Sequence, residues 1–212
     1  MASSERIIAT FLQRVSTGAI DDVRALLLAV PALVNAVGPH PLWGGRPQAL
    51  HVAIECGHRD LFDLLLEHGA DLNGRNDAYD LWSPLMIAVH RGRTEMRDEL
   101  ITRGARIRVP EALLMGNDEM TEALLARGLP AAAPNGGSLL AFARTTPAID
   151  FLIAIGAETD VKDRWGTTPI MALRRLGATG RPLVDHLVKL GIPEPPPETN
   201  TPSPQARKPP SP

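Results

Sequence analysis

Apolar residues recur at helical spacing in short segments that glycines separate. In residues 58–68, the apolar side chains form one stripe along a predicted helix and polar residues occupy the other side: Leu61, Phe62, Leu64, Leu65 and Leu66. A helix of about eleven residues is marginal on its own, so neighbouring helices must cover the stripe. The pattern therefore predicts short amphipathic helices that pack against one another.

This pattern repeats along the chain. Residues 48–70 and 83–105 superimpose without a gap and begin 83 − 48 = 35 residues apart, with Gly57 matching Gly92 between the two helices of each copy. Weaker copies keep the same frame in residues 9–36, 107–128, 138–157 and 166–191. The sequence therefore predicts about six helix pairs.

Helix boundaries carry their own signals. Ser83-Pro84 and Thr168-Pro169 each place a capping hydroxyl before a proline in the first helical turn. Glycines that we expect in the left-handed conformation follow the second helices: Gly69, Gly104, Gly128, Gly156 and Gly191. Helix pairs that repeat in this way form a solenoid, in which each unit is stabilised by its neighbours.

The residues resemble the ankyrin repeat. Its motif, roughly D-x-x-G-x-T-P-L-H-x-A-A-x-x-G-H followed by a Leu-rich helix and G-A-D-x-N, is matched by ALHVA at 49–53, Gly57-His58 and GADLN at 69–73. Further matches are SPL at 83–85 and GTTP at 166–169. The resemblance implies an all-α solenoid of antiparallel helix pairs joined by β-hairpin-like fingers, curved so that one face is concave.

Two departures from the repeat divide the chain. Between the third and fourth repeats the finger is largely missing, because Gly92 and Gly116 are only 116 − 92 = 24 residues apart, and we expect stacking to be weakest there. Residues 193–212 contain nine prolines among twenty residues, which predicts a disordered or polyproline-like tail. The predicted organisation is a repeat domain at 1–192 and a Pro-rich tail at 193–212.

Composition narrows the function. A net charge of −2 excludes a strongly basic nucleic-acid binder, and the single Cys56 excludes an intramolecular disulfide and a multi-cysteine zinc site. No apolar run reaches the 18 residues of a membrane span, and no secretory signal begins the sequence. We expect a cytoplasmic monomer that uses no cofactor or metal and binds neither nucleic acid nor membrane.

No catalytic motif is apparent. The six histidines do not follow zinc-ligand spacing, and the resemblance implies that His51 and His58 order turns of the scaffold. There is no G-x-S-x-G motif, and TGRP at 179–182 lacks the Gly-Lys-Ser/Thr of a phosphate loop. The sequence therefore predicts a protein that is not an enzyme.

The aromatic residues fall into two groups. Phe11, Phe62, Phe142 and Phe151 occupy apolar helix positions and are predicted to be core, whereas the Trp and Tyr residues lie in fingers. The resemblance implies that variable finger positions contact targets, and Trp, Tyr and Arg dominate interface hot spots. The residues predicted to bind a partner are Trp43, Glu55, Tyr79, Asp80, Trp82, His90, Arg91, Arg164, Trp165 and Thr167.

Other interpretations stay open for several of these residues. The finger aromatics could pack on neighbouring fingers, and the Arg-rich stretch 91–108 could be a solvated helix face with internal pairing rather than a strip for an acidic partner. The predicted function is binding of an unidentified protein through the concave face and finger tips. The alternatives are an accessory or regulatory subunit whose Pro-rich tail recruits a second partner, and, less well supported, an enzyme with an unrecognised site.

Overall fold

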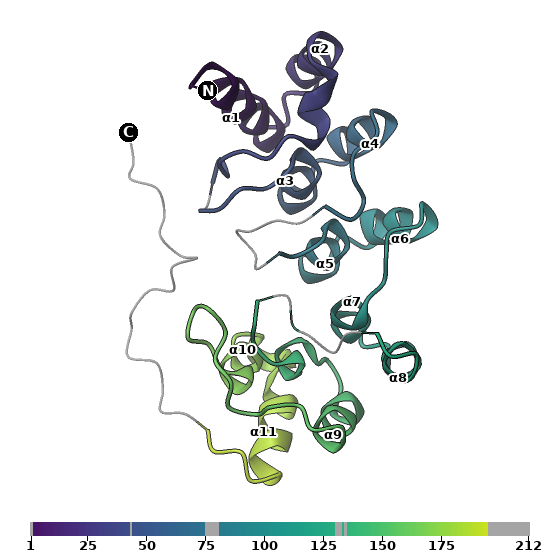
Figure 1. Ribbon diagram of the computed structural model, residues 1–212, viewed down its shortest axis with the longest axis vertical. Helices are drawn as coiled ribbons and strands as arrows, with labels where there is room; N and C mark the ends of the chain where they lie inside the picture. Colours follow the sequence, from purple (N-terminus) through teal and green to yellow (C-terminus); the bar gives the residue numbers. More distant parts are fainter. Residues whose placement is uncertain (1, 43, 75–80, 130–132, 134, 195–212) are drawn as a thin grey trace. The chain divides into compact units, whose positions relative to one another are not determined.

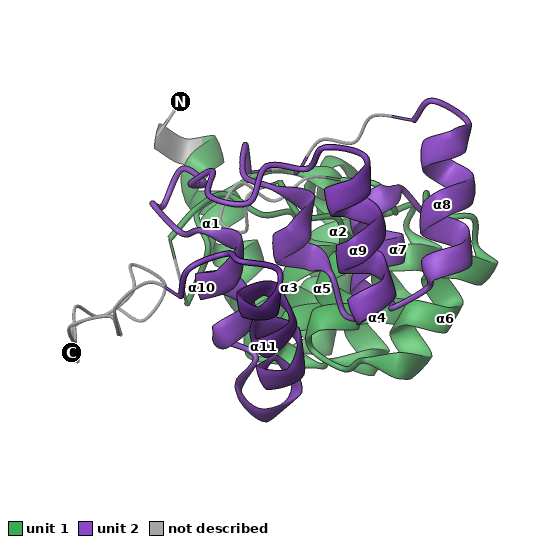
Figure 2. Ribbon diagram, turned by 90° about the horizontal axis from the view of Figure 1, so that it is seen from below, with its two compact units in different colours: residues 1–106, 200–212 green, residues 107–199 purple. Residues whose placement is uncertain are grey.

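The computed structural model describes residues 2–42, 44–74, 81–129, 133 and 135–194, and these residues are largely helical. They form two compact units, the first ending at Arg106 and the second beginning at Ile107 (Figure 2). Trp43, Tyr79, Asp80 and the tail from residue 195 onward lie outside the described residues.

The first unit contains three helix pairs, and its elements are α1 (Ala2–Ser16), α2 (Ile20–Ala29), the short 3-10 helix η1 (Pro31–Asn35), α3 (Ala49–Cys56), α4 (Arg59–Glu67), α5 (Pro84–His90) and α6 (Thr94–Thr102). Helix α3 packs between α1 and α5, and α2, α4 and α6 follow one another in a second row (Figure 1). This arrangement is the stacking that the repeated sequence pattern predicts.

The second unit contains three further pairs, and its elements are α7 (Val109–Leu114), α8 (Asp118–Ala126), the 3-10 helix η3 (Leu139–Phe142), α9 (Thr146–Ala154), α10 (Pro169–Arg174), the 3-10 helix η4 (Gly177–Thr179) and α11 (Arg181–Lys189). The part of the chain that the structure describes therefore contains six pairs, in agreement with the predicted number of about six. In the fifth pair, however, the first helix is a four-residue 3-10 turn. Thr145-Thr146-Pro147 begins α9 only three residues after Phe142, which leaves no room for a longer helix before it.

The capping signals hold in the structure. The hydroxyls of Ser83 and Thr168 accept hydrogen bonds from the backbone N–H groups of Met86 and Met171, at 3.2 and 3.5 Å. The five glycines predicted to follow second helices have φ between +73° and +88°. These caps explain where α5 and α10 begin and where α4, α6, α8, α9 and α11 end.

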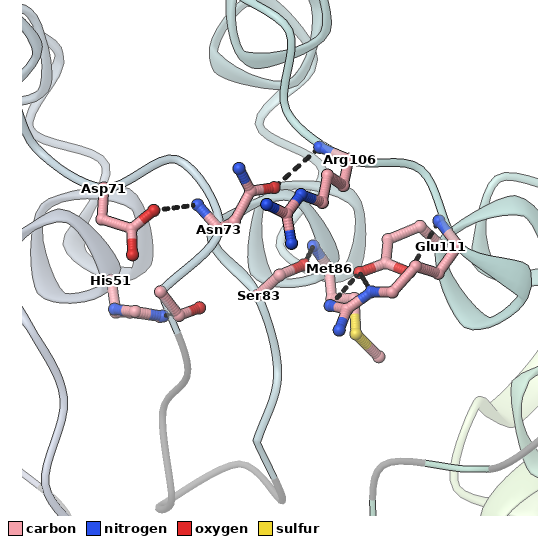
Figure 3. A network of polar contacts seen from close by, with 9 residues as sticks. His51, Asp71, Asn73, Ser83, Met86, Arg106 and Glu111 are labelled. Atoms are coloured by element: carbon pink, nitrogen blue, oxygen red, sulfur yellow. Dashed lines mark hydrogen bonds and ion pairs between the residues drawn. The ribbon is translucent and has the colours of Figure 1, made fainter. Parts of the chain in front are cut away.

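Asparagines connect successive repeats of the first unit. Asn35 accepts a hydrogen bond from Asp71 N–H at 2.8 Å and donates to the carbonyl of Gly69 at 3.0 Å. One repeat further on, Asn73 accepts from Arg106 N–H at 2.7 Å (Figure 3). The asparagine at the end of the repeat motif therefore ties each finger to the next.

The core consists of the facing apolar stripes. Phe11 and Phe62 are fully buried and Phe142 is nearly so, as predicted. Phe151 is only half-buried, contrary to expectation. The buried face of α9 is formed by Ala148, Ile149 and Leu152. Phe151 directly precedes Leu152, so its side chain is turned by about 100° around the helix and lies at the edge of this face.

Candidate partner-binding surface

A buried carboxylate organises the C-terminal ends of α3 and α5. The side chain of Glu55, on α3, is only 4% exposed, and its Oε1 lies 2.6 Å from the guanidinium of Arg91, the residue that ends α5. Its Oε2 lies 3.0 Å from His40 Nε2, in the finger before α3. Glu55 therefore joins three successive segments of the first unit.

Hydrogen bonds determine which ring nitrogen of His40 carries a hydrogen. The backbone N–H of Leu42 donates to His40 Nδ1 at 3.0 Å, so Nδ1 carries no hydrogen and Nε2 donates to Glu55. The imidazole in this arrangement is neutral. The negative charge of Glu55 is thus balanced by Arg91, which is about one-third exposed and remains partly at the surface.

Two aromatic rings, one of them on the residue before Arg91, pack against each other. The rings of Trp82 and His90 meet edge to face, with centroids 5.0 Å apart and planes inclined by 83°. Trp82 is half-buried and His90 is exposed directly before Arg91. We call Glu55, Trp82, His90 and Arg91 the α3–α5 surface, and all four residues belong to the set predicted from sequence.

The other predicted residues that the structure describes lie in the last finger, in the second unit. Trp165 is 44% exposed, and the guanidinium of Arg164 lies 5.0 Å from the centroid of its ring. Thr167 is buried, and its hydroxyl accepts a hydrogen bond from Arg175 at 3.2 Å. Arg164 and Trp165 therefore face solvent, whereas Thr167 supports the loop from within.

The Arg-rich stretch is largely paired within the protein. Arg97 lies 2.8 Å from Asp98, Arg103 lies 2.6 Å from Glu99, and Arg108 lies 2.7 Å from the buried Glu111. Together with Arg91, these pairs match the interpretation of a helix face with internal pairing.

Scaffold histidines take the predicted roles. Burial lowers the pKa of His51 to about 4, and its Nε2 lies 3.2 Å from the carbonyl of Gly74. His58 Nε2 lies 3.0 Å from the carbonyl of Ser16 in the preceding repeat. Both imidazoles bind backbone groups of their own unit, as expected for residues that order turns.

The environment of Cys56 does not activate its thiol. Burial, aided by the charge of Glu55, raises the pKa of the Cys56 thiol, which disfavours the reactive thiolate. Across the described ranges, no three His, Cys, Asp or Glu side chains are grouped so that they could hold a metal ion. None of the described helices combines the length and the apolar character that crossing a bilayer requires.

Sequence reasoning missed His40. It lies in the irregular segment PHPLWGGRP, and no spacing rule relates that segment to the end of a helix fifteen residues later. The contact arises because the finger returns over α3, which only the folded chain reveals.

The fold and this surface define a helical-repeat protein with stacked helix pairs. The family model of ankyrin repeats in three copies matches residues 15–111. These residues are therefore ankyrin repeats, which are generally protein-interaction modules, and in the structure the helix pairs continue beyond the match to Lys189.

Individual relatives match about half of the chain. Two probable E3 ubiquitin-protein ligases of Oryza sativa subsp. japonica, XBOS32 and XBOS33, are 33% identical over 106 residues and 36% identical over 100 residues. The matches cover 50% and 47% of this chain but only 19% and 17% of the ligases. Protein phosphatase 1 regulatory subunit 27 of Mus musculus is 30% identical over 95 residues, which are 45% of this chain and 57% of the mouse protein.

Proposed function

We propose that the chain is a non-catalytic protein-interaction module and that its first unit binds a partner protein through the α3–α5 surface. The observation that carries the proposal is the ion pair in which buried Glu55 holds Arg91 at 2.6 Å, and His90, the residue before Arg91, packs edge to face against Trp82. Trp and Arg are the residues that most often dominate binding energy. An arginine already held in place also loses less conformational entropy when a partner binds.

The absence of a catalytic role is part of the same proposal. The hollow between the inter-helix turns of the second and third repeats has a volume of about 320 Å³, and Arg59, Arg93 and Glu95 are its titratable lining residues. Arg93 donates to the carbonyls of Ile54 and Glu55, and Arg59 pairs with Asp63. These groups support the scaffold rather than converge on a reacting atom.

Quantitative affinity capture tests the proposed surface. The full chain, Trp82→Ala, His90→Ala and the matched control Arg97→Ala would each be immobilised after their folding had been checked by circular dichroism. A partner should be recovered with the wild type and Arg97→Ala, and at least about tenfold less with the two surface variants, as expected for hot-spot residues. If every protein captured by the wild type is captured equally by both surface variants, the proposed surface is wrong.

A regulatory subunit is the second candidate function. The likeness to a protein phosphatase regulatory subunit favours it, and the Pro-rich tail 193–212 would then recruit a second partner. Co-purification of the full chain with one enzyme in a fixed ratio would support this role. Loss of a second protein on replacing the tail prolines, with the first protein retained, would locate the second binding site.

A further inference from the structure

The loop at residues 163–167, here the Trp165 loop, is held rigidly by one carboxylate. Asp163 Oδ1 accepts hydrogen bonds from the backbone N–H groups of Trp165 and Thr167, at 2.9 and 2.8 Å. The N–H of Asp163 donates to the carbonyl of Thr167 at 3.0 Å, and Asn135 donates to Oδ2 at 3.1 Å. The loop therefore has a fixed conformation, set by its own sequence and by one neighbouring finger.

This rigid loop displays an aromatic ring and a cation. Trp165 is 44% exposed, and Arg164 lies within cation–π distance of its ring. Folding does not require so much exposed indole surface at a loop tip. A pre-organised indole beside a guanidinium suits an extended segment that carries prolines and a carboxylate, because proline rings stack on aromatic faces and the carboxylate pairs with the cation.

We propose that this surface binds the chain's own proline-rich segment, residues 195–212. The segment begins directly after Glu194, whose carboxylate lies 2.7 Å from Arg174 at the end of α10. Arg175, which follows Arg174 in sequence, donates a hydrogen bond to the hydroxyl of Thr167 in the Trp165 loop. The C-terminal end of α10 therefore contacts both the Trp165 loop and Glu194, the residue directly before the segment.

The composition of the segment fits this surface. Eight of its eighteen residues are proline, and Ala206 is its only other apolar residue, so prolines are its main means of covering an indole. Glu198 follows three consecutive prolines and complements the charge of Arg164. In the polyproline conformation eighteen residues extend roughly 56 Å, at about 3.1 Å per residue, which is ample to return from α10 to the neighbouring loop.

Attachment to the same chain makes even a weak contact effective. A short tether holds its segment at a local concentration in the millimolar range, so a contact with a Kd of about 1 mM would be formed about half of the time. A partner that uses Trp165 must then displace the segment first. The inference thus goes beyond the proposed function by assigning residues 195–212 as a competitor for the second unit's exposed aromatic surface.

Nuclear magnetic resonance of the tryptophan indole N–H groups tests the proposal on the full chain. The comparison variant replaces all eight prolines of residues 195–212 by serine, which keeps length and charge, and Trp165→Phe assigns the Trp165 signal. We expect the Trp165 signal to move on proline replacement and the Trp82 signal to stay in place. A synthetic peptide of residues 195–212, added at millimolar concentration to the serine variant, should move the Trp165 signal back towards its wild-type position.

Two results would overturn the proposal. The first is a Trp165 signal that is identical in the wild type and the serine variant and does not respond to the peptide, which would mean that the segment does not bind the loop. The second is a wild-type signal that moves to the serine-variant position on tenfold dilution, which would mean that the segment of a second copy is bound. A Trp165 signal that is independent of dilution and sensitive to the prolines supports an intramolecular contact.

Discussion

A carboxylate as deeply buried as Glu55 is tolerated only when its charge and its lone pairs are satisfied. Arg91 supplies the charge, and the His40 N–H supplies a second hydrogen bond. The three side chains come from three successive segments of the first unit, so the loss of one of them weakens the connection between these segments. Arg91 therefore has a structural role in addition to the binding role proposed for it.

Replacing Arg91 by Ala should destabilise the first unit by about 1–3 kcal/mol, because Glu55 would lose its balancing charge while staying buried. This loss of stability is smaller than that expected for breaking a fully buried ion pair, because the Arg91 side chain is about one-third exposed. Urea unfolding measures the loss. Arg97→Ala is the matched control, since its partner Asp98 is exposed, and it should cost no more than about 0.5 kcal/mol. Equal costs for the two variants would contradict this account of Glu55.

His51 should make stability depend on pH. Its pKa is lowered to about 4 in the folded protein and returns to 6.5 on unfolding, so the unfolded chain binds the extra proton. The stabilisation is present in full above pH 6.5 and is lost as the pH falls towards 4, by about 3 kcal/mol in total. Urea unfolding of the wild type and His51→Gln at pH 7, 5.5 and 4.5 should show a steeper loss for the wild type. Parallel losses would mean that His51 is not the responsible group.

At the scale of elements, the N-cap residues of α4 and α6 bond to the preceding repeat. His58, before α4, binds the last carbonyl of α1, and Arg93, before α6, donates to the carbonyls of Ile54 and Glu55 in α3. Asn117, before α8, instead caps its own helix by accepting from Met120 N–H. The Gly-His pair at 57–58 could be predicted from the repeat motif, but the same role for Arg93 could not, because it depends on the reach of a long side chain.

Gly57→Ala should cost more than Gly92→Ala. Both glycines occupy the inter-helix turn with positive φ, +77° and +64°, so alanine is strained at either position by about 1 kcal/mol. At Gly57 the new methyl group would lie within 2.7 Å of the Arg93 guanidinium, whereas nothing lies within 4 Å at Gly92. Displacing Arg93 from α3 should add about 1 kcal/mol. Thermal unfolding monitored by circular dichroism measures the difference, and equal losses would show that Arg93 contributes little.

At the scale of the whole molecule, the sequence predicts what repeats and misses what is particular to one place. The helix pairs, their caps and most of the core could be predicted because the same apolar, capping and glycine positions recur in each repeat. The 3-10 turn at Leu139–Phe142 and the half-buried Phe151 were not predicted, because both depend on how a shortened repeat fits its neighbours. Within the proposed α3–α5 surface, Trp82, His90 and Arg91 could be selected from sequence by residue type and position, and their role in binding stays a prediction. His40, the partner of Glu55 in the finger, could not be selected in this way.

The two units should differ in local stability. Among the described residues, 25 apolar side chains are buried between Phe11 and Ala105 and 16 between Val109 and Leu187, and the first helices of the pairs in the second unit are only four to six residues long. Short helices with less buried apolar surface open more readily, and repeat arrays separate where stacking is weakest. Hydrogen exchange of the full chain, followed by mass spectrometry, should therefore show stronger protection in residues 50–66 and 85–101 than in 138–188. Uniform protection across these segments would mean that the array opens as one cooperative unit and that the boundary after Arg106 carries no energetic weakness.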